Sequence, residues 1–108
     1  MKLAVIFLNR IEVLEDLLSA FLEIGISGAT VLDSVGMGHI ISENIPIFAG
    51  LRNTFAGSSP HNKIILIITE EDLVEHILEV IEEVCNQEED QTKSFMITLP
   101  IDKIFKNS

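Results

Sequence analysis

The order of strand-like and helix-like segments is the strongest constraint that this sequence places on its fold. A continuous apolar run, Leu3 to Leu8, has the length of a buried strand and is followed by an amphipathic helical pattern. A second strand pattern follows at about 29–35, and the second half of the chain repeats the scheme. Two strand–helix–strand units joined by a long connection predict an α+β fold, the ferredoxin-like βαββαβ sandwich.

Both helical segments carry signals for their ends and for the face that they bury. Asn9 is a good N-cap residue with Glu12 completing a capping-box pattern, and Gly25 is expected to end that helix in a left-handed conformation. Thr69 and Asp72 form a second N-cap signature. The apolar positions at helical spacing are Ile11, Leu14, Leu18 and Phe21 in the first helix and Leu73, Ile77, Ile81 and Val84 in the second.

Two further strands complete a four-stranded sheet. Lys63 to Ile68 is a β-branched run, and Ser94 to Leu99 is the last strand, before Pro100. We expect an antiparallel sheet with both helices on one face, because each helical crossover skips a strand position. Residues 1–108 are expected to form one domain, whose tail, 100–108, covers a sheet edge or reaches a neighbouring subunit.

The connection 36–61 has little helix or strand periodicity, and compact domains seldom carry such a segment without a function. It opens on Gly36-Met37-Gly38, a turn expected to leave backbone N–H groups free, and a short helix is predicted after Pro46. Its many apolar residues indicate a partner. The predicted partner-binding residues are Ile47, Phe48, Arg52 and Phe55. Packing of these residues on their own subunit or its oligomer mates is an equal alternative.

Charge and composition exclude several classes of function. With 17 acidic and 7 basic side chains the net charge is −10, which opposes binding to nucleic-acid phosphates. No apolar run reaches the ~18 residues of a membrane span, so no direct membrane insertion is expected. Asn9 and Arg10 interrupt any signal-peptide core, and the single cysteine, Cys85, suits a reducing cytoplasm.

Taken together, these segments resemble the P-II nitrogen-regulatory proteins, and more closely their divergent PII-like relatives. The resemblance rests on the βαβ repeat, on residues 25–31 (Gly-Ile-Ser-Gly-Ala-Thr-Val), on residues 35–38 (Val-Gly-Met-Gly) and on the long central loop. It implies a homotrimer with three intersubunit clefts that hold an adenine nucleotide. It also implies that loop 36–61, the T-loop of the family, controls a partner such as a membrane transporter or a metabolic enzyme.

The resemblance places ligand-binding residues at particular positions of this chain. Thr30, Gly36 and Gly38 match family positions that line the nucleotide cleft, with Met37 between the two glycines. The glycines would act through their backbone N–H groups, which can face an anion. Lys106 falls near a family arginine that contacts phosphate, after a one-residue insertion.

Other positions depart from the family pattern. The family's glycine-rich phosphate loop is replaced by Gln87–Lys93, which has no glycine and three acidic residues. Ile40 stands where the family has a glutamine that binds metal and 2-oxoglutarate, and the chain has no tyrosine to be uridylylated. Sensing of ATP and 2-oxoglutarate is therefore not expected, and a less charged nucleotide or another small ligand remains open.

Catalysis and metal binding have weaker support. No nucleophile lies at a suitable spacing from a base and an orienting group, so we expect no enzyme activity and no catalytic residue. The loop residues His39, Glu43 and His61 match no tight metal-ligand motif, and no metal site is predicted. Two alternatives to a regulatory protein stay open: a constitutive oligomeric interaction module without a ligand, and a divalent-metal-binding trimer.

Overall fold

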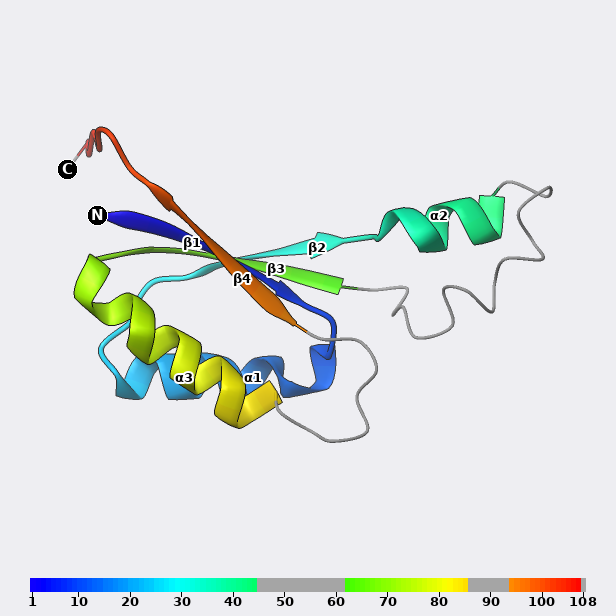
Figure 1. The fold of residues 1–108 in the computed structure, drawn as a ribbon, viewed down its shortest axis with the longest axis horizontal. Coiled ribbons are helices and arrows are strands. Elements are labelled where there is room, and N and C mark those ends of the chain that lie inside the picture. Colours follow the sequence, from blue (N-terminus) through cyan, green and yellow to red (C-terminus); the bar gives the residue numbers. More distant parts are fainter. Residues whose placement is uncertain (45–61, 86–93, 108) are drawn as a thin grey trace.

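A computed structural model describes residues 1–44, 62–85 and 94–107, without the side chains of 42–44. Its main elements follow one another along the chain as shown in Figure 1. They are β1 (Lys2–Leu8), α1 (Leu14–Glu23), β2 (Thr30–Ser34), α2 (Met37–Asn44), β3 (Asn62–Thr69), α3 (Val74–Cys85) and β4 (Phe95–Pro100).

The sheet has the topology that the sequence predicts. Its strands lie in the order β2–β3–β1–β4, and each neighbouring pair is antiparallel. The central strand β1 pairs with both β3 and β4, so that Leu3 lies opposite Ile68 on one side and Leu99 on the other. Helices α1 and α3 lie side by side on one face of this sheet (Figure 1). The fold is therefore ferredoxin-like.

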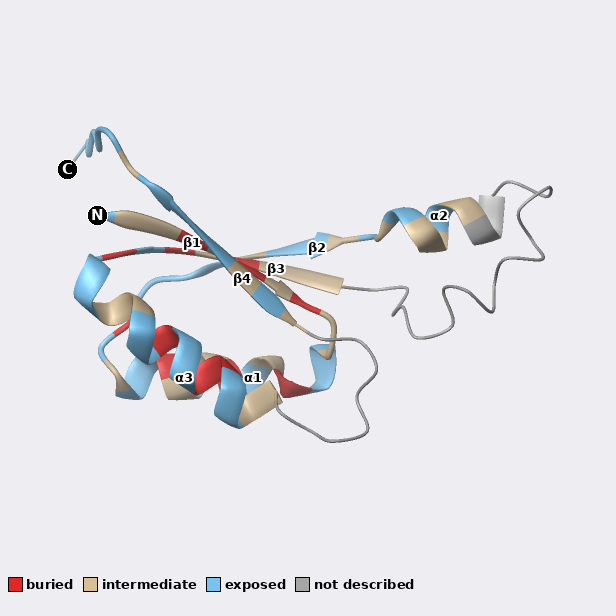
Figure 2. Cartoon of the chain, viewed as in Figure 1, coloured by how far each residue is buried: buried red, intermediate tan, exposed pale blue. Residues whose placement is uncertain are grey.

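The hydrophobic core lies between the two helices and the sheet face that they cover, as the buried residues in Figure 2 show. Its largest fully buried side chains are Ile6, Leu8, Leu17, Phe21, Ile65, Ile67 and Ile77. Burying one such side chain stabilises the fold by roughly 1.5–3 kcal/mol. The buried face predicted for α3 is confirmed, because Ile77 and Ile81 are buried while Leu73 and Val84 pack against the core.

The face predicted for the first helix is right except at its start, because Phe21 is buried and Leu14 and Leu18 pack against the core. Val13 and Leu17, which were not predicted, are also buried, whereas the predicted Ile11 is 39% exposed. The cause is a 3-10 turn, η1 (Ile11–Val13), that precedes α1. A 3-10 turn advances by about 120° per residue instead of 100°, which rotates Ile11 away from the face that α1 buries.

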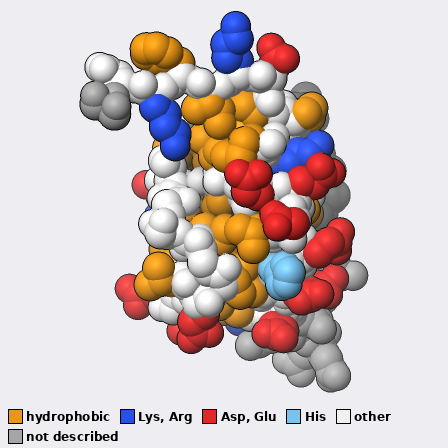
Figure 3. Space-filling view, turned by 90° about the vertical axis from the view of Figure 1, so that its left-hand side faces the viewer, with side chains coloured by type: hydrophobic (Ala, Val, Ile, Leu, Met, Phe, Trp, Pro, Cys, Tyr) orange, Lys and Arg blue, Asp and Glu red, His pale blue; other side chains and the backbone are white. Residues whose placement is uncertain are grey.

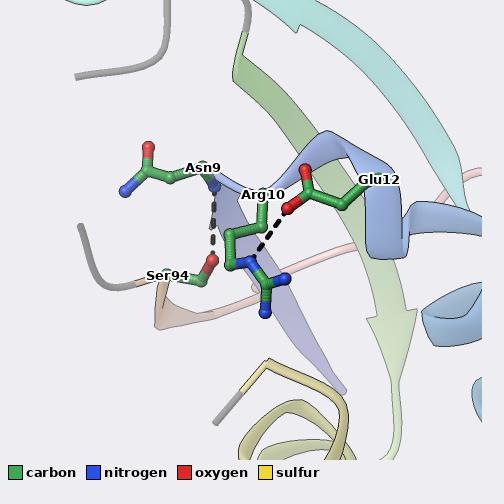
Figure 4. Close-up of polar contacts among 4 residues, drawn as sticks. All are labelled: Asn9, Arg10, Glu12 and Ser94. Carbon is green, nitrogen blue, oxygen red and sulfur yellow. Dashed lines mark hydrogen bonds and ion pairs between the residues drawn. The ribbon is translucent and has the colours of Figure 1, made fainter. Parts of the chain in front are cut away.

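The N-cap residues predicted for both helices are wrong. The turn η1 begins after Arg10, and η3 (Glu71–Leu73), which precedes α3, begins after Glu70; neither N-cap residue makes a side-chain capping hydrogen bond. Glu12 Oε1 instead accepts from Arg10 Nε at 3.0 Å (Figure 4). Competition from this ion pair and the tighter winding of the 3-10 turn explain why the spacing rule for α-helical caps fails here.

The predicted left-handed end of the first helix is confirmed. Gly25 has a φ of +97°. Its N–H donates to the Leu22 carbonyl at 3.1 Å, and the Ile26 N–H donates to the Phe21 carbonyl at 2.9 Å. These two hydrogen bonds form a Schellman motif, and the side chains of Phe21 and Ile26 are both buried, as is usual beside it.

The prediction that the connection after β2 lacks regular structure from residue 36 onward is wrong at its start. Residues Met37–Asn44 form α2, and the Ile40 N–H donates to the Gly36 carbonyl at 3.2 Å. Gly36 has no positive φ, so the expected glycine turn is a helix start. Two glycines lower the helix propensity of this segment, so its sequence does not indicate a helix. The predicted helix after Pro46 lies outside the described residues.

The C-terminal tail continues beside the N-terminus. The Ile101 N–H donates to the Met1 carbonyl at 3.2 Å, just beyond the last residue of β4, Pro100. A proline is tolerated there because β4 is an edge strand. Phe105 is 89% exposed, so this residue does not cover a sheet edge within the described part of the subunit.

Candidate functional site

The sheet face opposite α1 and α3, called the open face here, is apolar. Side chains alternate along a strand, and because Ala4, Ile6 and Leu8 point into the core, their neighbours point the other way. Pairing across the sheet then identifies ten large apolar residues on the open face: Leu3, Val5, Phe7, Leu32, Ile64, Leu66, Ile68, Phe95, Ile97 and Leu99.

Exposure and charge distinguish this face from the rest of the surface. Leu32, Ile68 and Phe95 are 47%, 56% and 53% exposed, respectively. The other open-face strand residues are uncharged: Thr30, Ser34 and Asn62. Seen from the end that carries both termini, hydrophobic side chains gather beside acidic ones (Figure 3). Apolar surface of this extent is typical of an interaction site.

A cavity of about 250 Å³ lies at one end of the sheet, where β1 ends and β3 and β4 begin. The strand register brings the lining residues to this end of the sheet. Phe7 pairs with both Ile64 and Phe95, and Ser34 pairs with Asn62. The lining residues are Phe7, Asn9, Ser34, Val35, Gly36, Asn62, Lys63, Ile64 and Phe95.

Two aromatic rings form one wall of this cavity. Phe7 and Phe95 stack with their ring centroids 4.5 Å apart and an interplanar angle of 15°. The hydrogen bond from the Asn9 N–H to Ser94 Oγ, at 3.2 Å, joins the end of β1 to the residue before β4 (Figure 4). This bond holds the two strand ends together and thereby fixes the ring pair.

Polar groups form another wall. Asn62 Oδ1 is buried and has no hydrogen-bond partner among the described residues. The Asn62 Nδ2 lies 3.7 Å from the place where a Cβ on Gly36 would stand. Lys63 also lines the cavity, but it pairs with Leu8 across the sheet, so its side chain lies on the sheet face that carries α1 and α3. There its Nζ makes an ion pair with Asp33 Oδ1. The site thus combines aromatic surface with one carboxamide oxygen that has no partner among the described residues.

A single subunit does not bring the predicted ligand-binding residues together. Gly36 lines the cavity, and Gly38 lies in the first turn of α2. Met37 is 73% exposed and does not line the cavity. Thr30 lies at the far end of β2, and Lys106 is exposed in the tail that follows β4 at that far end of the sheet. A site that contains all five residues would need a second subunit.

Several predictions fall on residues that the structure leaves undescribed. The partner-binding residues Ile47, Phe48, Arg52 and Phe55 lie outside the described ranges, as does most of the acidic segment Gln87–Lys93. His61 and the side chain of Glu43 are also undescribed. Across 1–44, 62–85 and 94–107, no group of three or more His, Cys, Asp and Glu side chains is placed to hold a metal ion.

Sequence analysis missed most of the residues that line the cavity. Phe7, Ile64 and Phe95 lie in runs predicted as strands, but such runs give no indication of which side chains share a face. Asn62 precedes the predicted start of its strand and carries no motif. The signal that identifies them is strand pairing, which sequence patterns do not specify.

Comparisons with known proteins do not assign the chain. No protein-family model matches it, and no curated protein sequence does. None of the helices in the described ranges combines the length and apolar character needed to cross a membrane. Function is therefore inferred from the open face, the cavity and the resemblance of the sequence.

Proposed function

We propose that this chain is a cytoplasmic PII-like regulatory protein that forms a homotrimer, binds a small effector between subunits and controls a partner protein through segment 36–61. The observation that carries the proposal is the position of the cavity. It opens beside Gly36, where that segment begins, and on the apolar open face, where a second subunit would pack. The sequence resemblance to the P-II family supports the same arrangement.

The distribution of charge favours self-association through the open face. A chain of net charge −10 repels its own copies wherever two acidic surfaces meet. The open face has no charged strand residue, so two copies can meet there without that repulsion. Burial of apolar side chains such as Ile68 and Phe95, each more than half exposed, would supply the driving force.

Contact between effector and α2 supplies a route for regulation. Gly36 both lines the cavity and accepts the first hydrogen bond of α2, from the Ile40 N–H. A ligand that contacts Gly36 therefore contacts the backbone that begins the helix. It shifts the conformational equilibrium of the following segment to the extent that it binds one conformation more tightly. A transporter or metabolic enzyme that docks on this segment would sense the change.

Three measurements test the proposal together. Light scattering after size exclusion should give a mass three times that of the 12.0 kDa chain. A thermal-shift screen with AMP, ADP, ATP, cyclic AMP, bicarbonate and 2-oxoglutarate, extended to uncharged ring compounds, should find at least one stabilising ligand, because a ligand that binds only folded protein raises its stability. Hydrogen exchange in 37–44 should change with that ligand.

A constitutive interaction module without a ligand remains the second candidate, because the apolar open face alone accounts for it. Such a protein would assemble without any additive and give a flat thermal-shift response to every compound. Its hydrogen exchange in 37–44 would be the same under all conditions. An oligomer with that behaviour would replace the proposed function by this alternative.

A further inference from the structure

The cavity beside Gly36 lacks an available positive charge among the described residues that line it. Lys63 is the one basic residue among them, and its side chain lies on the other sheet face, where Nζ is paired with Asp33 Oδ1. A phosphate that entered would meet no cationic side chain of the described lining and would approach a chain of net charge −10. The cavity is therefore better matched to an uncharged ligand than to a polyphosphate.

Asn62 defines which hydrogen bond such a ligand must make. Its Oδ1 is buried and unpartnered among the described residues, and the residue lines the cavity. Native proteins rarely leave a buried acceptor unsatisfied, because the group has lost its water without gaining a partner. A ligand that donates an N–H would supply the missing bond.

The remaining walls define the shape of the ligand. Phe7 and Phe95 present a stacked ring pair, and Ile64, the partner of Phe7 on β3, adds an aliphatic surface. A planar ring extends such a stack favourably. The cavity of about 250 Å³ has room for one or two fused rings, since an apolar cavity of about 150 Å³ accepts benzene.

We infer that this cavity binds an uncharged, planar heteroaromatic ring that donates an N–H hydrogen bond to Asn62 Oδ1 and lies against the Phe7–Phe95 pair. The inference rests on the proposed function, because it names the chemical class of the effector. It selects a free base or a nucleoside over the phosphorylated nucleotides.

Calorimetric titration of the full chain with matched probes tests both parts of the inference. Benzimidazole should bind about three- to tenfold more tightly than 1-methylbenzimidazole, because N-methylation removes the single donor. The control is 2-methylbenzimidazole, which has the same added methyl group but keeps the N–H and should bind like benzimidazole. For the charge, adenosine should bind more tightly than AMP.

Variants assign the binding to the cavity. Asn62→Ala should bring the ratio between benzimidazole and 1-methylbenzimidazole close to one, whereas the same change at the exposed tail residue Asn107 should leave it unchanged. Phe95→Leu should weaken every ring probe without altering that ratio. It thereby separates stacking from hydrogen bonding even if the Asn62 variant folds poorly.

The outcomes separate this inference from the proposed function. Equal binding of benzimidazole and 1-methylbenzimidazole, or tighter binding of AMP than of adenosine, would overturn the inference and leave an effector-binding oligomer in place. If no ring probe binds but a charged compound does, the inference is likewise overturned and the proposed function stands. If no compound binds in titration and none shifts the melting temperature, the proposed function is overturned as well.

Discussion

Phe7 and Phe95 stack with their ring centroids 4.5 Å apart, and this contact joins the central strand β1 to the edge strand β4 on the open face. Aromatic pairs of this kind add about 0.5–1.5 kcal/mol beyond the area that they bury. A double-mutant cycle with Phe7→Leu and Phe95→Leu should therefore give a coupling free energy in that range, measured by urea unfolding. Additive effects of the two changes would show that the pair is not coupled.

A charge placed on the open face should prevent self-association. Ile97, on β4, is 45% exposed there, and Ile97→Glu would bury a carboxylate against a second subunit. The variant should elute as a monomer at a concentration where the unmodified protein is oligomeric. Thr98→Glu adds the same charge at the next position, on the other face of the strand, and should leave the oligomer intact.

Gly25→Ala should destabilise the fold because an alanine at a φ of +97° is strained. The expected loss in free energy of unfolding is about 1–2 kcal/mol. Gly28 provides the matched control, since it has no positive φ and no atom within 4 Å of an added Cβ. Gly28→Ala should change stability by less than about 1 kcal/mol, and a loss equal to that of Gly25→Ala would contradict the role of the Schellman motif.

Two leucines of α1 should differ sharply when truncated. Leu17 is fully buried, whereas Leu22 is 64% exposed. Leu17→Ala leaves a cavity in the core and should cost about 2–5 kcal/mol of unfolding free energy. Leu22→Ala should change it by about 0.5 kcal/mol or less, the usual effect of a surface substitution. Similar losses for the two variants would mean that α1 presents a different face to the sheet.

Asp33→Asn should leave the preference of the cavity for a neutral ligand unchanged, because Asp33 and Lys63 pair on the sheet face that carries α1 and α3. Asp33 is 86% exposed, so the ion pair itself should contribute about 1 kcal/mol or less to folding. The ratio of the affinities for AMP and adenosine, measured by calorimetric titration, should be the same in the variant and the unmodified protein. A salt-sensitive gain in AMP affinity in the variant would show that Lys63 Nζ reaches the bound ligand.

The fold could be predicted from the sequence to a large extent because its strongest signals are local. The apolar run Leu3–Leu8, the stripe of α3 and Gly25 each depend on neighbouring residues, and the structure has them in the expected states. Helix α2 was missed because Gly36 and Gly38 outweighed the remaining helix formers in a propensity argument.

The site was less predictable because it is made by distant residues. Phe7, Asn62 and Phe95 meet through strand pairing, and a strand that is apolar at every position has no alternation to show which side chains lie on which face. Family resemblance pointed to Gly36, which lines the cavity. It also selected Lys106, which lies beyond the other end of the sheet in this subunit.

The apolar character of both faces of β1 has a consequence for how the sheet finds its alignment. In a sheet with one polar, solvent-exposed face, a slip of one residue would expose the core side chains of that strand and bury its polar ones. Here a slip would exchange Leu3, Val5 and Phe7 for Ala4, Ile6 and Leu8, with little change in hydrophobicity. We expect alignment to be selected instead by side-chain volume, above all at Ala4, a small residue that is fully buried in the core.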